Sequence, residues 1–204
     1  MIRKNRSYKK GEAFRDAKLI FIYCEGEKRE KDYFDYFTNK TQKIIFTIIP
    51  PENGESSPEH LLTKAEFDLI DESKKYDLSD EDEVWFVIDT DRWGKAIPKL
   101  RKECVKYNWN IAQSNPCFEV WLYYHFQKFE LFNDMEKGQR WKEKVHEVSV
   151  HGFHSDQHPV YIASAIIHAK EKYVTENQEM NIGCSEVFKL AESFYPFVQK
   201  QIQN

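Results

Sequence analysis

The sequence predicts an α/β fold, with a parallel sheet of about four strands flanked by helices and a helical extension at the C-terminal end. First, residues 18–131 contain four short apolar runs, which are typical of buried parallel strands. Second, segments with helical apolar spacing separate these runs, and such alternation indicates a parallel sheet with right-handed crossovers. Third, the strand signals stop near residue 132, whereas helical patterns continue.

The composition indicates one domain with an extension, in a chain of 204 residues. Apolar residues make up 41% and aromatic residues 15% of the chain, which is enough for a packed core. No stretch approaches the ~20 apolar residues of a membrane span, and no apolar signal-peptide region is visible at the start. We therefore expect a cytoplasmic protein without membrane contact. The four cysteines form no Cys-x-x-Cys pair, which argues against disulfides and zinc.

The first two strands are predicted at residues 19–24 and 43–49, because both segments are apolar and the second is rich in β-branched residues. The first ends in Glu25-Gly26, where the glycine lets the chain turn sharply into a helix that includes Phe34. A second helix is predicted over residues 58–75, with a proline suited to its start.

The third and fourth strands are predicted at residues 84–88 and 109–113, with a helix over residues 96–107 between them. After the fourth strand, Asn115 can cap a helix and Pro116 can take its first position. That helix is apolar on nearly all sides, so we expect it to be buried.

The chain is expected to divide into three parts: a basic arm over residues 1–17, a catalytic core over 18–131, and a helical extension over 132–204 that packs on the core. In the extension, residues 135–148 are interpreted as a helix or a mobile insertion, and residues 159–174 and 185–194 as amphipathic helices.

The segment before the first strand is basic and lacks apolar periodicity. Its cations, counted to the start of the strand, are Arg3, Lys4, Arg6, Lys9, Lys10, Arg15 and Lys18. One interpretation is a solvated tail, and the other is an arm that binds nucleic-acid phosphates without reading sequence. The net charge of −4 argues against nucleic-acid binding by the whole surface, so such binding would be local.

Three carboxylates follow predicted strands: Glu25 comes after the first, and Asp89 and Asp91 come after the third. The carboxyl ends of parallel strands share one edge of a sheet, so these side chains can converge. A divalent cation would hold the crowded carboxylates ionised, and oxygen-only ligation suits Mg²⁺ or Mn²⁺. We therefore predict a catalytic metal site with these ligands. The alternative is a polar turn with a helix cap.

Two further carboxylates are candidates for a second metal site. Glu119 lies in the first turn of the helix after the fourth strand, where the helix N-terminus stabilises a carboxylate. We include it among the catalytic candidates, with an early stabilising Glu as the alternative. Glu30 is the other candidate and, like Glu27, is left undecided because acids in a first helical turn can point outward.

Three basic residues beside these acids are predicted to bind phosphate. Lys28 and Arg29 lie at the start of the first helix, where backbone N–H groups can help, and Arg92 follows Asp91. An exposed helix face is the alternative for at least one of the first two.

Histidines give weaker signals. The spacing of His151, His154 and His158 permits metal binding, but no neighbouring strand end or cysteine supports it, so a polar loop is the simpler interpretation. His125, within an apolar helix, is predicted to be a hydrogen-bonded core histidine.

Three motifs in order resemble the RloB-like family, whose proteins carry a Toprim-like core: CEGEKRE…YF, WFVIDTDR and SNPCFEVWLYYHF. Toprim domains have a Glu after the first strand and an Asp-x-Asp after a later one, which match Glu25, Asp89 and Asp91. In the related overcoming-lysogenization-defect nucleases a second Glu follows the Glu-Gly turn. Glu30 is the nearest match here, with a spacing one residue longer.

The resemblance implies a Mg²⁺-dependent endonuclease that hydrolyses phosphodiester bonds of DNA or RNA. It also implies an effector of an anti-phage, restriction-type defence system that works with an ABC-type or AAA-like ATPase partner; homo-oligomer formation is left open. A rival from another class is a non-catalytic nucleic-acid-binding or adaptor subunit of such a complex. A haloacid-dehalogenase-type phosphatase with Asp89 as nucleophile is disfavoured, because that fold places its Asp-x-Asp after the first strand.

Overall fold

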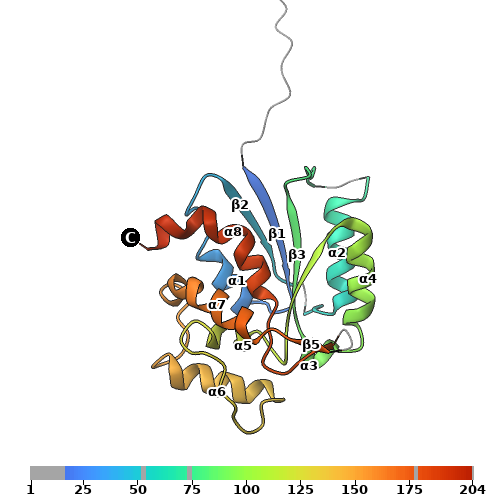
Figure 1. Cartoon of the computed structure of the whole chain (residues 1–204). Helices are drawn as coiled ribbons and strands as arrows, with labels where there is room; N and C mark the ends of the chain where they lie inside the picture. The colour runs from blue at the N-terminus through green and yellow to red at the C-terminus, as the bar shows by residue number, and fades with distance from the viewer. Residues whose placement is uncertain (1–16, 52–53, 73–74, 177–178, 204) are drawn as a thin grey trace, which may run out of the picture.

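A four-stranded parallel sheet forms the centre of the protein. The computed structural model describes residues 17–51, 54–72, 75–176 and 179–203, so the expected basic arm lies almost wholly outside the described residues. The strands are β1 (Lys18–Cys24), β2 (Ile44–Ile49), β3 (Glu83–Asp89) and β4 (Asn110–Ser114). Their order is β2-β1-β3-β4 and every neighbouring pair is parallel (Figure 1). The predicted fold class is confirmed, and the architecture is consistent with a Toprim-like fold.

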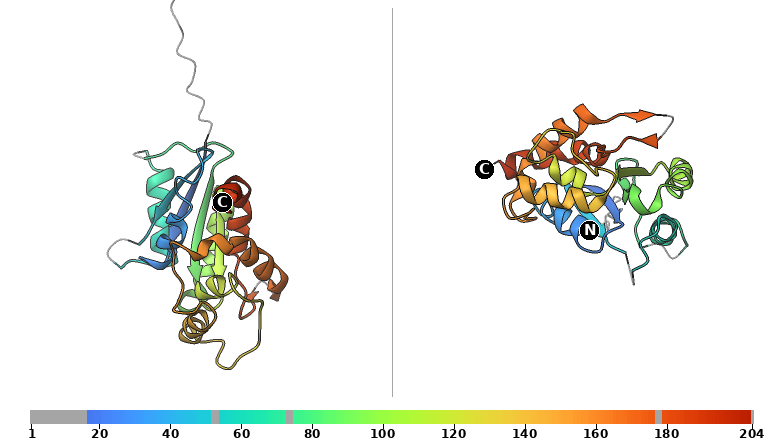
Figure 2. Two further views of the ribbon diagram at one scale, coloured as in Figure 1. Left: turned by 90° about the vertical axis from the view of Figure 1, so that its left-hand side faces the viewer. Right: turned by 90° about the horizontal axis from the view of Figure 1, so that it is seen from below.

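Helices cover both faces of the sheet (Figure 1). One face carries α2 (Pro58–Leu69) and α4 (Ile97–Tyr107). The helices on the other side of the molecule are α1 (Arg29–Asp35), α5 (Glu119–Tyr123), α6 (Gly138–Val148), α7 (Ile162–Lys172) and α8 (Val187–Ile202). The remaining short elements are α3 (Thr90–Trp93), the 3₁₀ turn η1 (His158–Tyr161), β5 (Thr175–Glu176) and β6 (Glu179–Met180). Of these helices, α6 lies beyond the carboxyl ends of the strands (Figures 1 and 2).

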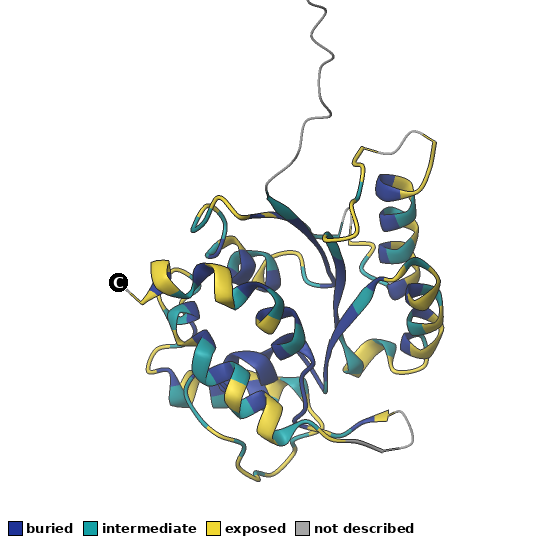
Figure 3. Ribbon diagram, turned by 45° about the horizontal axis from the view of Figure 1, so that its top comes forward, coloured by how far each residue is buried: buried dark blue, intermediate teal, exposed yellow. Residues whose placement is uncertain are grey.

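Side-chain alternation along the strands divides the core into two clusters. Ile20 and Ile22 of β1 belong to the cluster shared with α1, α5, α7 and α8, whereas Phe21 and Tyr23 belong to the cluster shared with α2 and α4. The central strands β1 and β3 are therefore buried on both faces, as Figure 3 shows, whereas the edge strand β2 is partly exposed. The first cluster also contains Trp141 and the buried face of α8, so residues 132–204 share one core with the sheet.

Several predicted boundaries are wrong. Asn115 does not cap a helix, because its side chain donates to the carbonyl of Met180 and α5 begins only at Glu119. The second predicted helix ends at Leu69 rather than near residue 75, and the last one continues to Ile202. The antiparallel β5–β6 pair was not predicted.

The four cysteines and His125 are all buried, which confirms the prediction of a core histidine. His125 is a core histidine: its Nε2 lies 3.1 Å from the Tyr33 hydroxyl and its Nδ1 3.1 Å from the carbonyl of Trp121. Burial lowers the pKa of His125 to about 3, so the ring is neutral. In the part of the chain that the structure describes, no helix has the length and apolar character needed to cross a membrane.

Candidate active site

A pocket of about 340 Å³ lies at the carboxyl edge of the sheet. Its walls carry five carboxylates, here termed the acid pocket residues, which come from the ends of β1 and β3 and from the first turns of α1, α3 and α5. They are Glu25, Glu30, Asp89, Asp91 and Glu119. The structure thus brings together all four predicted catalytic residues and the predicted second-metal candidate Glu30.

The pairing of β1 with β3 places the first two of these acids. Cys24 is the register partner of Val87, and the backbone N–H of Glu25 donates to the carbonyl of Val87 at 3.0 Å. The Glu25 side chain then turns toward β3, where its Oε2 accepts from the backbone N–H of Asp89 at 2.8 Å. This bond fixes Glu25 beside the Asp-x-Asp turn.

Gly26 lies in the bend over residues 25–28 that leads into α1, as predicted for the Glu25-Gly26 turn. Its φ is not among the positive values of the described chain, so the bend does not require a glycine for its backbone angle, and the glycine instead leaves space for Glu30. A Cβ at position 26 would lie 1.9 Å from Oε2 of Glu30, whose carboxyl group folds back over the Glu25-Gly26 turn into the pocket. Glu27, in contrast, is exposed and does not line the pocket.

The acid pocket raises the pKa of three of its members. Burial raises the pKa of Glu25, and it raises that of Glu30 to about 7, with a further contribution from Glu119. Burial also raises the pKa of Asp89 well above its ordinary value, and Glu25, Glu30, Glu119 and Asp91 raise it further. Neighbouring carboxylates therefore raise the pKa values of these three groups. A bound cation would lower these values and allow all five groups to be ionised at the same time.

Three cations flank these acids: Arg29, Arg92 and Lys142 all line the pocket. None of them forms an ion pair with another residue in the described ranges. Arg92 lowers the pKa of Glu25 from a distance, although burial outweighs this effect. The predicted phosphate-binding residue Lys28 is placed differently, because it is exposed, lies 3.8 Å from Asp32 and does not line the acid pocket.

The start of α6 forms a wall of the pocket that was not predicted. Gly138, Gln139 and Lys142 line it, and a Cβ at Gly138 would lie 3.3 Å from Oδ2 of Asp91. The segment around α6 reads as a charged helix with scattered apolar positions, and no local pattern indicates what it packs against. The position of these residues in the pocket wall therefore becomes visible only in the tertiary structure.

Backbone and side-chain bonds hold the Asp-x-Asp turn. The backbone N–H groups of Thr90 and Asp91 donate to the carbonyl of Pro116 at 3.0 and 3.1 Å. The Thr90 hydroxyl donates to the carbonyl of Ser114 at 2.8 Å and accepts from Nε2 of Gln113 at 2.7 Å. Thr90 therefore ties the turn to β4.

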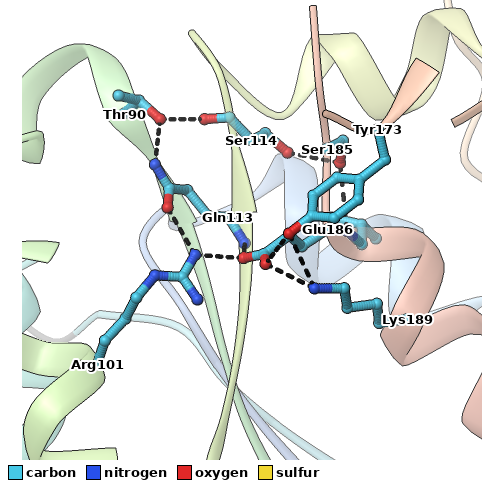
Figure 4. Close-up of polar contacts among 9 residues, drawn as sticks. Thr90, Arg101, Gln113, Ser114, Tyr173, Ser185, Glu186 and Lys189 are labelled. Atoms are coloured by element: carbon cyan, nitrogen blue, oxygen red, sulfur yellow. Dashed lines mark hydrogen bonds and ion pairs between the residues drawn. The ribbon is translucent and has the colours of Figure 1, made fainter. Parts of the chain in front are cut away.

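Gln113 connects this turn to a second buried carboxylate, Glu186, just before α8 (Figure 4). Arg101 donates to both Gln113 and Glu186, while the Tyr173 hydroxyl and Lys189 Nζ each lie 2.8 Å from the other oxygen of Glu186. Burial raises the pKa of Glu186, but the two cations outweigh burial and hold it below its ordinary value. Glu186 and its four partners, Arg101, Gln113, Tyr173 and Lys189, are termed the Glu186 network.

The histidine loop is built around ring packing. His158 Nδ1 accepts from the backbone N–H of His154 at 3.0 Å, and its ring packs on Phe126 and Phe153.

Within the described residues, no group of three or more His, Cys, Asp or Glu side chains is placed to hold a metal ion as it stands. The acid pocket fits Mg²⁺ through its donor chemistry, since all five ligand candidates are carboxylates, and side-chain rotation would have to complete a coordination shell.

The amino end of β1 lies far from these acids. Because β1 has seven residues at ~3.3 Å each, its first residue, Lys18, lies about 20 Å from Glu25. Of the predicted basic arm, only residue 17 lies within the described residues.

Comparison with known families identifies the chain. The sequence model of the family described as RloB-like protein matches residues 20–194, a range that contains every acid pocket residue and extends through the first half of α8. Comparison with curated proteins and with solved structures gives no match. With the match covering most of β1, the other three strands of the sheet and the helices that close the pocket, the chain belongs to the RloB-like family.

Proposed function

We propose that the protein is a Mg²⁺-dependent nuclease that hydrolyses phosphodiester bonds of DNA or RNA in the acid pocket. The observation that carries this proposal is the convergence of five carboxylates on one pocket beside three cations that lack ion pairs within the described residues. Three of the carboxyl groups have a raised pKa, and such perturbed groups cluster at functional sites.

In this proposal Glu25, Asp89 and Asp91 hold Mg²⁺ or Mn²⁺, and Glu119 and Glu30 complete a second ion site or orient the attacking water. The bound ion supplies the charge that polarises the scissile phosphate and stabilises the leaving oxygen. The hydrogen bond from the Asp89 backbone keeps the Glu25 carboxylate at the position where it would be needed.

Other residues of the pocket would neutralise the charge of the phosphate and transfer protons. Arg29, Arg92 and Lys142 can neutralise the phosphate, since each lines the pocket and none is engaged by a described carboxylate. Glu30 is the candidate for proton transfer if it does not ligate an ion, because its carboxyl group is buried in the pocket near Glu119 and Glu25.

Family membership supports a wider role. The resemblance of RloB-like proteins to effectors of anti-phage defence leads us to propose that this nuclease acts in such a system with an ABC-type or AAA-like ATPase partner. Co-expression with a neighbouring ATPase gene and pull-down of the tagged chain would test this part separately from the chemistry.

The test of the chemistry is cleavage of labelled DNA and RNA in Mg²⁺ by the full chain and by Asp89→Ala. We expect the variant to lose Mg²⁺-dependent cleavage while keeping its fold by circular dichroism. Asp80→Ala is the matched control, since Asp80 lies exposed in a turn remote from the pocket, and it should cleave normally. Undiminished cleavage by Asp89→Ala would refute the assignment.

A non-catalytic adaptor is the second candidate. It is favoured by the observation that no described group of three or more potential ligands is placed to hold a metal as it stands. It predicts that alanine variants of Glu25, Asp89 and Asp91 keep full biological activity, which the nuclease proposal excludes.

A further inference from the structure

The acid pocket adjoins two further hollows along α1, because each hollow shares lining residues with the next. The first, of about 630 Å³, shares Arg29, Glu119, Gln139 and Lys142 with the acid pocket and lies between α1 and α6. The second, of about 870 Å³, shares Arg29 and Phe153 with the first and extends along α1 to Lys40. Together the three hollows form one path, here termed the α1 groove, with Arg29 lining every section.

Positive charge without a partner follows this path. Some cations of the groove are engaged, since Lys28 faces Asp32 at 3.8 Å and Arg140 donates to Glu143 at 2.8 Å. Lys142, Arg29 and Lys40, in contrast, form no ion pair with any residue in the described ranges. They lie at the acid end, along the path and at the far end, which is the arrangement that a chain of phosphates would require.

The far end also offers an aromatic surface. Lys40 Nζ lies 4.6 Å from the ring centroid of Tyr36, and both side chains line the last hollow. Tyr36 is half-buried, so part of its ring is accessible. Cations combined with aromatic rings are typical of channels for single-stranded nucleic acid, where bases stack and the backbone follows the charge.

We propose that the α1 groove binds one strand of a single-stranded nucleic acid, which runs from the acid pocket past Arg29 to Lys40. This inference rests on the proposed function, because the phosphate of that strand in the acid pocket is the one to be cleaved. The charges of Asp32 and Asp35 in these walls are offset by ion pairs with Lys28 and Lys31. The cations without ion pairs follow one another along α1 and do not form the broad basic surface that a duplex uses, so the groove suits a single strand better.

The test measures binding by fluorescence anisotropy with the full chain carrying Asp89→Asn, so that the probe is not cleaved. The probes are a labelled 20-nucleotide single strand, as DNA and as RNA, and the corresponding duplexes. Lys40→Glu and the milder Lys40→Gln are compared with Lys102→Glu, which makes the same charge change at an exposed position of α4 on the other face of the sheet. Melting curves establish that each variant is folded.

We expect Lys40→Glu to weaken single-strand binding about tenfold and to reduce the salt slope by about 0.7, the value for one phosphate contact. Lys40→Gln should have a smaller effect in the same direction, and Lys102→Glu should change the affinity less than about twofold. Equal effects of Lys40→Glu and Lys102→Glu, duplex binding as tight as single-strand binding, or no binding to any probe would each overturn the proposal.

The result is separable from that of the proposed function. If the groove binds a strand but the chain is not a nuclease, Lys40→Glu weakens binding although the unmodified protein cleaves nothing. If the chain is a nuclease without this groove, Asp89→Ala abolishes cleavage while Lys40→Glu binds as tightly as Lys102→Glu.

Discussion

The acid pocket and the Glu186 network lie on either side of Thr90, and they surround their buried carboxylates with opposite kinds of partner. In the acid pocket, burial raises the pKa of Glu30 to about 7, and the neighbouring carboxylates add to the effect. In the Glu186 network, Arg101 and Lys189 hold the pKa of Glu186 below its ordinary value despite burial. Glu30 is 5% exposed and Glu186 is 3% exposed, so burial alone does not make the difference.

The difference lies in the partners. Glu186 is satisfied by two cations, a tyrosine hydroxyl and a backbone N–H, so its ionised form stabilises the folded chain. The acid pocket residues face one another, so ionising them opposes folding until a cation is bound. We infer that the Glu186 network is structural and that the acid pocket is functional. Gln113 joins the two through its bond to Thr90.

The largest expected effect is on cleavage. Asp89→Asn removes one carboxylate from the acid pocket, and we expect Mg²⁺-dependent cleavage to fall by at least ~10³-fold, as for the loss of a group that stabilises the transition state. Because burial raises the pKa of Asp89, the same change should raise the melting temperature in EDTA. If Asp89→Asn instead lowered stability and left cleavage normal, the acid pocket would be structural and not functional.

The next effect is on stability. Glu186→Gln leaves Arg101 and Lys189 without their carboxylate, and we expect the free energy of unfolding to fall by about 1–3 kcal/mol in urea titrations at pH 7, because both cations are more than a third exposed and water can solvate them. The wild-type contribution of Glu186 is present above the ordinary pKa of Glu and is lost as the pH falls below it, because its folded-state pKa is lowered. Glu192→Gln is the control on α8, since its exposed ion pair with Lys170 should contribute less than about 1 kcal/mol.

Glu30→Gln should act in the opposite direction to Glu186→Gln. The pKa of Glu30 is about 7 in the folded protein against an ordinary 4.5, so the stability it contributes is full below pH 4.5 and is lost as the pH rises to 7. In EDTA above pH 7, the variant should therefore be more stable than wild type by about 3 kcal/mol, with a flatter stability profile between pH 4.5 and 7. Glu27→Gln, at an exposed position, should leave the profile unchanged.

The smallest effect is expected at Gly26. A methyl group there would overlap the Glu30 carboxyl group, which is the flexible end of a side chain and can rotate away. Gly26→Ala should therefore change stability by no more than about 1 kcal/mol at pH 4.5, where Glu30 is protonated in the folded chain, and should flatten the pH profile above it in the same direction as Glu30→Gln. A wild-type profile in Gly26→Ala would show that the carboxyl group of Glu30 does not depend on the space over this glycine.

Sequence reasoning located the parts of the site that depend on strand ends. Glu25, Asp89 and Asp91 could be placed because parallel strands bring their carboxyl ends to one edge, and Glu119 because its helix starts at that edge. Glu30 could not be decided, because the choice between inward and outward depends on the space over Gly26, which only the folded chain reveals.

The contributions of α6 and α8 could not be predicted from local patterns. Lys142 reaches the pocket because α6 packs beyond the strand ends, and Glu186 reaches β4 because the chain returns to the sheet before α8. Both depend on long-range packing, to which neither charge pattern nor apolar periodicity is sensitive.

The most direct test of the comparison is a crystal of the full chain soaked with Mn²⁺ and measured at the manganese absorption edge. The acid pocket, if it is a metal site, should show an anomalous peak within about 2.1 Å of carboxylate oxygens of Glu25 and Asp89, and the peak should be absent in Asp89→Asn. If the wild-type pocket shows no peak while its carboxyl groups keep their positions, the claim that the acid pocket is a cation-binding site is contradicted.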